Sequence, residues 1–304
     1  MPKPKITIGI CVKNAQNILA TTIESIISQD YDHKLIEIIF VDDGSQDKTL
    51  SIIENQISNM DIGARVFSHK WKGLGPSRNV VVDNAKGDYI IWVDGDLKLS
   101  RDYVRRQVEF MEKNPRAGIA KGKFWDFKDI QALSNQNLVA FLEHVGFIAV
   151  DIKSGDMPNK ILPGTAGSIY KLKAIRQVGG FDNYIRGAGE DIDAAYRIRK
   201  KGWLIYHATS GVFITHFPKT WSSLFRKYYW YGYGLVYVYL KNKEMRKLWY
   251  LLPPTAFLSG LLSSSIAYEY TRCKAVFLLP FHFLFKMTAW WFGFINGYFS
   301  IDID

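Results

Sequence analysis

The first hundred residues alternate short apolar runs with stretches whose apolar residues recur at helical spacing. Apolar and β-branched residues dominate 6–12, 36–41, 64–68 and 88–93, which predicts four strands. The intervening segments 15–28, 47–58 and 76–85 place apolar residues three or four positions apart, which predicts helices. The run 36–41 is apolar almost throughout and suits a strand that is buried on both faces. This order predicts an α/β fold in which helices flank a largely parallel, Rossmann-like sheet.

Beyond residue 100 the pattern is less regular. Helices are expected near 102–113 and 136–149, and strands near 117–124 and 211–215. Residues 163–203 form a second block that is dense in glycine and acidic residues. The sequence contains no internal repeat that would indicate a solenoid or propeller.

Polar clusters follow three of the predicted strands. Asp94 and Asp96 come directly after the run 89–93, with Gly95 between them, while Lys13-Asn14 and Asp42-Asp43 follow two other strands. In doubly wound sheets ligands collect beyond the carboxyl ends of the strands. Carboxylate oxygens suit hard cations such as Mg²⁺ and Mn²⁺, which keep open positions for substrate phosphates. Asp94 and Asp96 therefore predict a divalent-cation site, and an ordinary surface turn is the alternative.

The chain changes character near residue 219. From 219 to 247 aromatic residues alternate with seven basic residues and one acidic residue, Glu244. This composition is typical of a membrane interface. Two apolar stretches follow, 248–267 and 275–299, each about as long as the roughly 20 residues that a spanning helix needs. Prolines at 253, 254 and 280 leave two further arrangements open: a hairpin lying in the plane of the membrane, or a buried pair of helices in a soluble protein.

Composition narrows the range of partners. The formal net charge of +10 favours anionic partners such as nucleotide diphosphates, acidic lipids or nucleic acid. Because the basic residues concentrate beside the apolar stretches, lipid is the better match and no nucleic-acid partner is expected. The two cysteines, Cys11 and Cys273, suggest neither a disulfide framework nor a zinc cluster. With no apolar secretion signal at the N-terminus, we expect the chain on the cytoplasmic face of the cell membrane.

Six motifs in order along residues 5–217 resemble those of glycosyltransferase family 2. They are Val12-Lys-Asn14, Val41-Asp-Asp-Gly-Ser45, Gly75-Pro-Ser-Arg-Asn79, Val93-Asp-Gly-Asp96, Gly179-Gly-Phe-Asp182 and Gly189-Glu-Asp191. The resemblance implies the A-type nucleotide-diphospho-sugar transferase fold (GT-A), inversion at the sugar carbon, and Mn²⁺ or Mg²⁺ as cofactor. Together with the composition of the later segments, it predicts three parts: a catalytic domain over 1–218, the basic and aromatic interfacial segment 219–247, and the hydrophobic helical hairpin 248–304, which is either transmembrane or in-plane.

The resemblance assigns roles on the nucleotide side. Asp42 would accept a hydrogen bond from an N–H of the base, which favours a UDP-sugar and leaves a GDP-sugar as the alternative. Lys13, Asn14 and Asp43 would complete the nucleotide-binding set, with Asp43 the more structural. Arg78 would help to hold the donor, or else lie on a solvated first turn. The Asp42-Asp43-Gly44-Ser45 stretch could equally be a strand-to-helix turn with a capping role.

Further roles concern the metal and the reaction. Asp96 would bind the cation, and Asp94 would contact the sugar-nucleotide or the cation. Asp191 would be the general base for the acceptor hydroxyl, with an N-cap as its alternative, and Glu190 an acceptor binder or a partner of the helix dipole. His216 would be an additional metal ligand, or an ordinary hydrogen-bonded histidine.

The resulting prediction is a membrane-associated enzyme that transfers one sugar to a lipid phosphate, a lipid-linked glycan or a nascent polysaccharide. The sequence lacks a Gln-x-x-Arg-Trp motif, which argues against processive synthesis. Two alternatives remain. One is a sugar-phosphate nucleotidyltransferase, although the chain lacks a glycine-rich loop after its first strand; the other is a non-catalytic protein of the same fold, bound to the membrane.

Overall fold

The computed structural model describes residues 3–123, 127–154, 158, 161–185, 188–245 and 251–300. The chain divides into two compact units. Unit 1 comprises Met1–Phe124, Ser154–Tyr184 and Glu190–His216, and unit 2 comprises Trp125–Lys153, Ile185–Gly189 and Phe217–Asp304. The three-part division expected from the sequence stays a prediction.

Unit 1 is built on a mixed sheet. Its strands are β1 (Ile6–Val12), β2 (Ile36–Asp42), β3 (Gly63–Ser68), β4 (Tyr89–Trp92), β5 (Lys98–Leu99), β6 (Ala117–Lys123), β7 (Ser168–Lys171) and β8 (Leu204–Ile214). The sheet has eight strands in the order β3-β2-β1-β4-β7-β6-β8-β5. Strands β3, β2, β1 and β4 are parallel, β7 runs antiparallel to both β4 and β6, and β8 is parallel to β6. The predicted α/β class is confirmed, with a mixed rather than a purely parallel sheet.

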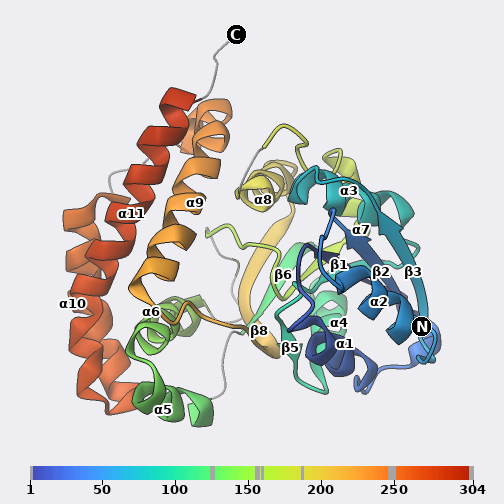
Figure 1. The fold of residues 1–304 in the computed structure, drawn as a ribbon, viewed down its shortest axis with the longest axis horizontal. Helices are drawn as coiled ribbons and strands as arrows, with labels where there is room; N and C mark the ends of the chain where they lie inside the picture. The colour runs from blue at the N-terminus through green and yellow to red at the C-terminus, as the bar shows by residue number, and fades with distance from the viewer. Residues whose placement is uncertain are drawn as a thin grey trace. The chain divides into compact units, whose positions relative to one another are not determined.

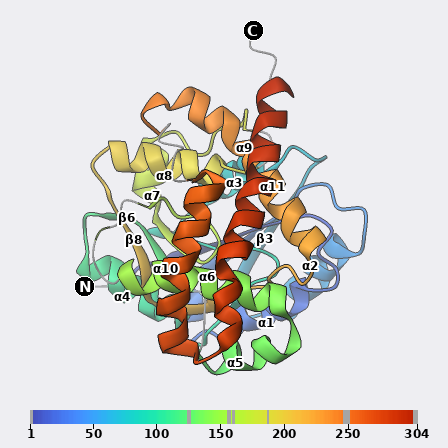
Figure 2. The same cartoon turned by 90° about the vertical axis from the view of Figure 1, so that its left-hand side faces the viewer.

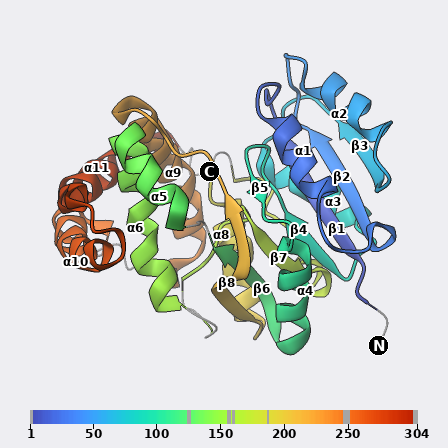
Figure 3. The ribbon, with the colours of Figure 1, turned by 90° about the horizontal axis from the view of Figure 1, so that it is seen from below.

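Helices cover both faces of this sheet (Figures 1 and 3). They are α1 (Leu19–Ile27), α2 (Thr49–Ile57), α3 (Leu74–Asn84), α4 (Tyr103–Lys113), α7 (Leu172–Gln177) and α8 (Glu190–Lys200). Alternate strand residues point to opposite faces. Ile91 of β4 accordingly joins the core with α1, α2 and α4, whereas its neighbour Ile90 joins the core with α3, α7 and α8. The central strands are buried on both faces, as their uninterrupted apolar runs predict.

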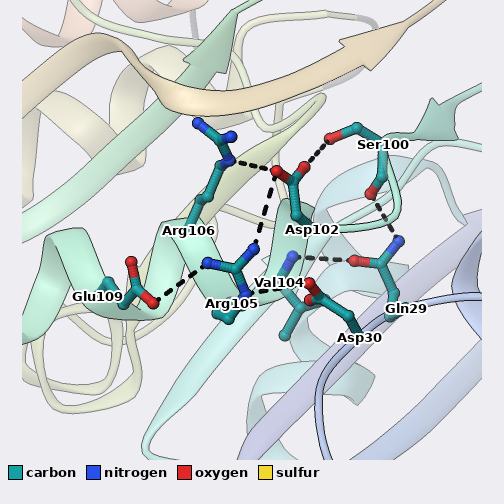
Figure 4. A network of polar contacts seen from close by, with 8 residues as sticks. All are labelled: Gln29, Asp30, Ser100, Asp102, Val104, Arg105, Arg106 and Glu109. Carbon is teal, nitrogen blue, oxygen red and sulfur yellow. Dashed lines mark hydrogen bonds and ion pairs between the residues drawn. The ribbon is translucent and has the colours of Figure 1, made fainter.

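A polar network joins the end of α1 to the start of α4 (Figure 4). The buried side chain of Gln29 donates to the carbonyl of Ser100 at 2.8 Å and accepts from the backbone N–H of Val104 at 2.9 Å. Beside it, Arg105 pairs with Asp30 at 3.0 Å and Asp102 with Arg106. The amide of Gln29 satisfies the N–H of Val104 in the first turn of α4, and it is a second donor to the carbonyl of Ser100, which also accepts from the N–H of Tyr103 at 2.9 Å.

Unit 2 is helical. It contains α5 (Phe127–Gln136), α6 (Leu138–Ser154), α9 (Trp221–Lys241), α10 (Pro253–Thr271) and α11 (Leu279–Ser300), with short 3₁₀ turns at Lys243–Met245 and Lys274–Leu278. Figure 2 shows α10 and α11 side by side. Within the described residues one helical stretch, Lys274–Ser300, is long and apolar enough to cross a membrane by length and composition.

The prolines of the hydrophobic region begin helices instead of interrupting them. Pro253 and Pro254 occupy the first positions of α10, and Pro280 lies in the first turn of α11. The missing N–H of proline has no cost there, because the first N–H groups of a helix have no intrahelical acceptor.

Candidate active site

The Asp-x-Asp motif lies in a tight turn. Strand β4 ends at Trp92, and the N–H of Leu97 donates to the carbonyl of Asp94 at 3.0 Å to close the turn. A Cβ on Gly95 would come within 2.8 Å of a methyl group of Val12, so the turn packs against the end of β1. The two carboxylates are therefore placed by a turn that follows the strand.

Asp96 meets the segment that follows β8. Its Oδ2 accepts a hydrogen bond from Thr215 Oγ1 at 3.1 Å, and its backbone carbonyl lies 3.3 Å from Nδ1 of His216. The predicted metal residues Asp96 and His216 are thus neighbours, although they are distant in the sequence. His216 also has an ordinary hydrogen-bonding role there.

The described residues contain no group of three or more His, Cys, Asp or Glu side chains that could hold a metal ion by themselves. This donor set still fits Mg²⁺ or Mn²⁺, which proteins usually hold through one or two carboxylates, with water and substrate phosphates supplying the other ligands. Asp94 and Asp96 are the residues that would provide those carboxylates. A closed structural site, which needs four protein ligands, does not fit.

Asp94 is the centre of an electrostatic cluster. Burial raises the pKa of its carboxyl; the Arg78 guanidinium opposes this rise, Asp96 and Asp191 add to it, and Lys121 opposes it. The side chain nevertheless remains 43% exposed, so it borders solvent. The charges of the other predicted metal carboxylate, Asp96, and of the predicted base, Asp191, therefore both act on Asp94. A bound cation would relieve the repulsion among these three acids.

Arg78 and Glu190 form an ion pair inside unit 1. It joins α3 to the first residue of α8, with side chains only 5% and 1% exposed. The other side of the guanidinium lies 3.8 Å from Asp94 Oδ1 and over the ring of Phe181 at 5.8 Å. Glu190 was predicted to bind the acceptor or to be a partner of the helix dipole; it lies in the first turn of α8 and its side chain pairs with Arg78. By this geometry Glu190 positions the guanidinium group of Arg78.

Asn79, the next residue of α3, binds the Gly-Gly-Phe-Asp loop. Its side chain donates to the carbonyl of Phe181 and accepts from the N–H of the same residue, both at 2.8 Å. This paired contact fixes the loop that leads toward α8. Asn79 is thus a packing residue, and Arg78 alone points toward the acidic cluster.

Asp191 lies in the first turn of α8. Its Oδ2 accepts from the N–H of Thr165 at 3.2 Å, and its Oδ1 from the N–H of Ile192 at 2.8 Å. Because α8 begins at Glu190, Asp191 is already inside the helix and is not its N-cap. A Cβ on Gly164 would lie 3.0 Å from Asp191 Oδ2 and 3.9 Å from Lys121 Nζ.

Lys121 was not singled out from the sequence. It is a buried residue of β6 whose charge acts on Asp94. The available signal was a lysine between two small residues, Ala120 and Gly122, in the strand Ala117–Lys123. A buried lysine is rare unless it is paired.

On the nucleotide side, Asp42 ends β2 and is buried. Its Oδ2 accepts from the N–H of Ser45 at 3.2 Å and from Ser68 Oγ at 3.4 Å. Among the described residues, its Oδ1 has no hydrogen-bond partner. A buried acceptor without a donor is unfavourable, and a ligand N–H would relieve it.

Asp43 points to the loop before α3. Its two oxygens accept from the N–H groups of Lys72 at 2.8 Å and Gly73 at 3.0 Å, and His69 lies 3.3 Å away. These contacts hold the loop 69–73 against the end of β2. Asp43 therefore has a structural role in this loop, and its part in nucleotide binding stays a prediction.

The loop after β1 completes this side. Asn14, at φ 52°, accepts from the N–H of Gln46 at 2.8 Å and donates its own N–H to Ser45 Oγ at 2.9 Å. Lys13 Nζ lies 4.9 Å from the ring of Trp71, which is 60% exposed. Asn14 thus fixes the turn that contains Asp42, and Lys13 forms a cation–π contact with the loop that Asp43 holds.

Cys11 connects the two sides of the site. Burial raises the pKa of its thiol to about 12; the Arg78 charge opposes this effect, and the Asp94 and Asp43 charges add to it. Residues from the nucleotide side and from the acidic cluster therefore both act on the end of β1. The predicted site residues lie along one edge of the sheet of unit 1.

Comparison with known families gives two matches. The model described as "Glycosyl transferase family 2" matches residues 7–153, and the model described as "Glycosyl transferase family group 2" matches residues 89–300. Together they include every predicted site residue.

Two curated proteins with similar sequences are also named as glycosyltransferases. Glycosyltransferase GlyA of Streptococcus pneumoniae is 29% identical over 197 residues, which cover 62% of this chain and 27% of that protein. The cholesterol galactosyltransferase of Borreliella burgdorferi is 26% identical over 188 residues, which cover 61% of this chain and 46% of that protein. The matched region is thus less than half of either relative.

Solved structures share the fold. The mannosyltransferase PcManGT from Pyrobaculum calidifontis, in complex with GDP-Man and Mn²⁺, aligns with a TM-score of 0.70 at 17% identity, over 99% of this chain and 89% of that one. TarS 1-349 of S. aureus in complex with UDP aligns with a TM-score of 0.50 at 13% identity, over 99% and 93%. At such identities the likeness concerns the fold alone, and it confirms the GT-A arrangement.

Proposed function

Because the chain belongs to glycosyltransferase family 2 and is an enzyme of glycosyl transfer, we propose that it moves a single sugar from a nucleoside-diphosphate donor to an acceptor at the membrane, with inversion. The observation that carries this proposal is that Arg78 lies 3.8 Å from Asp94, on which the charges of Asp96 and Asp191 also act. Donor, cation and acceptor base need this proximity, because an in-line displacement brings all three to one carbon.

Donor binding is assigned to the nucleotide side. Asp42 offers one oxygen without a partner among the described residues, which suits a base with a single N–H at that edge, such as uracil. Guanine presents two neighbouring N–H donors and would use both oxygens, one of which Ser45 and Ser68 already engage. The exposed ring of Trp71 is the surface on which the base stacks. A UDP-sugar is therefore the proposed donor. PcManGT, whose complex contains GDP-Man, is the reason to test GDP-sugars beside it.

Different residues of the chain carry out different parts of the proposed reaction. Asp191 accepts the proton of the acceptor hydroxyl as the oxygen attacks the anomeric carbon. Arg78, held by Glu190, directs its charge toward the diphosphate that leaves on the opposite side. A divalent cation held by Asp96 and Asp94 supplies Lewis-acid neutralisation of the leaving group when it is bound. For a lipid phosphate acceptor, which is already ionised, Asp191 instead orients the nucleophile.

The acceptor is proposed to be a lipid phosphate, a lipid-linked glycan or a nascent polysaccharide at the cytoplasmic face of the membrane. The support is the basic and aromatic segment 219–247 and the apolar helices that follow it. Holding the active site near lipid would shorten the search for such an acceptor.

The test is release of nucleoside diphosphate from a panel of nucleotide sugars, with lipid extract as acceptor, in Mn²⁺ or in Mg²⁺. Asp191→Asn is expected to lower kcat at least a hundredfold with little change in donor affinity, and Asp96→Asn to abolish stimulation by the metal. Asp61→Asn, which alters a surface pair with His33, is the matched control and should keep full activity. Full activity of Asp96→Asn in chelator would refute the metal role. Formation of nucleoside triphosphate and sugar 1-phosphate when pyrophosphate is added to the nucleotide sugar would instead indicate nucleotidyl transfer.

A further inference from the structure

Helix α10 has its large apolar side chains on the outside. Leu258, Leu261 and Leu262 are exposed, Leu262 at 73%. The buried positions of the helix hold small or hydroxyl residues, namely Ala256, Gly260, Ser264, Ala267 and Thr271. A helix at the surface of a water-soluble protein shows the opposite pattern, with its large apolar residues toward the core.

Helix α11 and the turn before it also have large apolar side chains on the outside. The exposed residues are again large and apolar: Phe277, Phe281, Phe292, Ile295 and Phe299, the last at 81%. The residues turned inward include His282 and Lys286, both buried. Charged and ionisable groups therefore face the interior of unit 2, and leucine and phenylalanine face outward.

Small residues allow close helix contacts. Gly232 of α9 packs on the backbone of Trp290, and Gly293 of α11 packs on the backbone of Tyr229. A Cβ at either position would collide with a backbone atom of the facing helix. Close packing through small residues is the way in which helices associate in lipid, where burying apolar surface gives no driving force.

The interior of unit 2 holds a buried ionic cluster. Glu143 of α6 accepts from Tyr228 at 2.9 Å and from Lys227 at 3.3 Å, and its other oxygen lies 3.5 Å from Lys286 and 3.6 Å from His282. Three helices thus direct their charged groups to one point. In membrane proteins ionisable residues likewise face the bundle interior and pair with one another.

Both helices have lengths that match a bilayer, and the stretch Lys274–Ser300, which contains α11, is the one among the described residues that is also apolar enough to cross it by itself. α10 has 19 residues and α11 has 22. At 1.5 Å per residue they are about 28 and 33 Å long, close to the roughly 30 Å hydrocarbon core of a bilayer. A helix lying in the interface needs a strongly charged face toward water. Residues 251–268 contain no charged residue, and 275–300 contain only the buried Lys286.

We propose that α10 and α11 form a hairpin inserted in the bilayer, with their exposed Leu and Phe faces against lipid acyl chains. The Glu143 cluster is then the polar interior of this bundle. This inference deepens the membrane location in the proposed function, and it selects insertion over an in-plane hairpin and over a buried soluble pair.

The test places single spin labels on the full chain in phosphatidylglycerol-containing vesicles, in a background with Cys11→Ala and Cys273→Ser. Labels at Phe281 and Phe292, eleven residues apart on one exposed face of α11, report depth from the ratio of collisions with O₂ and with a water-soluble nickel chelate. Insertion predicts high O₂ and low nickel accessibility, and depths that differ by about 16 Å, less any tilt. A label at Ile18, an exposed apolar residue of unit 1, is the control and should be reached by nickel.

Each other outcome overturns the inference. Equal, shallow depths at the two positions would indicate an in-plane hairpin. Nickel access at both would indicate a water-exposed surface, and access to neither reagent would indicate a protein partner on this face. Nucleoside diphosphate release by the unlabelled chain with its natural cysteines, in the same vesicles, separates the two proposals. Insertion without transfer would count against the function alone, and transfer without insertion would count against the hairpin alone.

Discussion

Breaking the Arg78–Glu190 pair should destabilise unit 1 far more than removing both partners together. Removing one member of a buried ion pair typically costs about 3–5 kcal/mol, because an uncompensated charge stays inside the protein. With side chains 5% and 1% exposed, this pair belongs to that class. Replacing both partners with apolar residues of similar volume is often nearly neutral.

The two single substitutions should lower the free energy of unfolding by different amounts. In Glu190→Leu, Arg78 still has Asp94 3.8 Å away and the Phe181 ring beneath it, so the loss should lie near about 3 kcal/mol. In Arg78→Met, Glu190 loses its cation while its Oε2 already has no partner among the described residues. This loss should lie near about 5 kcal/mol. The double variant should be more stable than Arg78→Met alone.

Pulse proteolysis of the full chain across a urea series, in detergent or vesicles, measures these differences from the fragments that survive. The Arg105–Glu109 pair on the exposed surface of α4 is the matched control, and its double-mutant cycle should show no measurable coupling. Additive losses for Arg78 and Glu190 would refute the reasoning, since independent residues add and coupled ones do not.

Two further predictions concern unit 1. Glu37 accepts hydrogen bonds from Thr7 and the N–H of Lys86, both at 2.6 Å, and from Arg65 at 2.7 Å. Burial raises the pKa of the Glu37 carboxyl, but these three donors outweigh burial, so its pKa is lowered. A lowered carboxyl pKa stabilises the fold above the unfolded value near 4.3, so Glu37→Gln should lower the urea midpoint at pH 7, and the gap should close as pH falls through the folded pKa; a gap that is unchanged at pH 3 would contradict this. Trp71→Ala should weaken UDP binding about tenfold in calorimetry while leaving the affinity for ribose 5-diphosphate unchanged, and equal loss for both ligands would rule out base stacking.

The sequence predicts the first four strands well for a physical reason. The apolar runs of β1, β2 and β4 are buried on both faces, so composition alone distinguishes them, whereas β3 is only partly buried at the outer side of the sheet. It does not predict β7, four residues long, which lies antiparallel between β4 and β6 and has no local signal of its own. Strand β8 begins at Leu204, seven residues before the expected run, because its pairing with β6 extends it.

The candidate site likewise has residues that the sequence predicts and residues that it does not. Site residues that are neighbours in the sequence, such as those of Asp94-Gly-Asp96, can be predicted because their short spacing alone indicates a shared ligand. The pairing of Arg78 with Glu190 joins residues 112 positions apart and follows from how α3 and α8 pack. Lys121 enters the acidic cluster for a similar reason, since only the sheet order brings β6 near α8 and β4.

The position of Arg78 depends on a glycine that no motif includes. Gly9 lies in the middle of β1, and a Cβ there would come within 2.8 Å of Val81 on α3 and 2.9 Å of Trp92 on β4. Its missing side chain therefore lets α3 lie close to the strand that ends at the acidic turn. Arg78 is one helical turn before Val81, and Trp92 is two residues before Asp94. A larger residue at Gly9 would have to move α3 or Trp92, so the distance between the site's cation and its carboxylates is set in the core of the sheet.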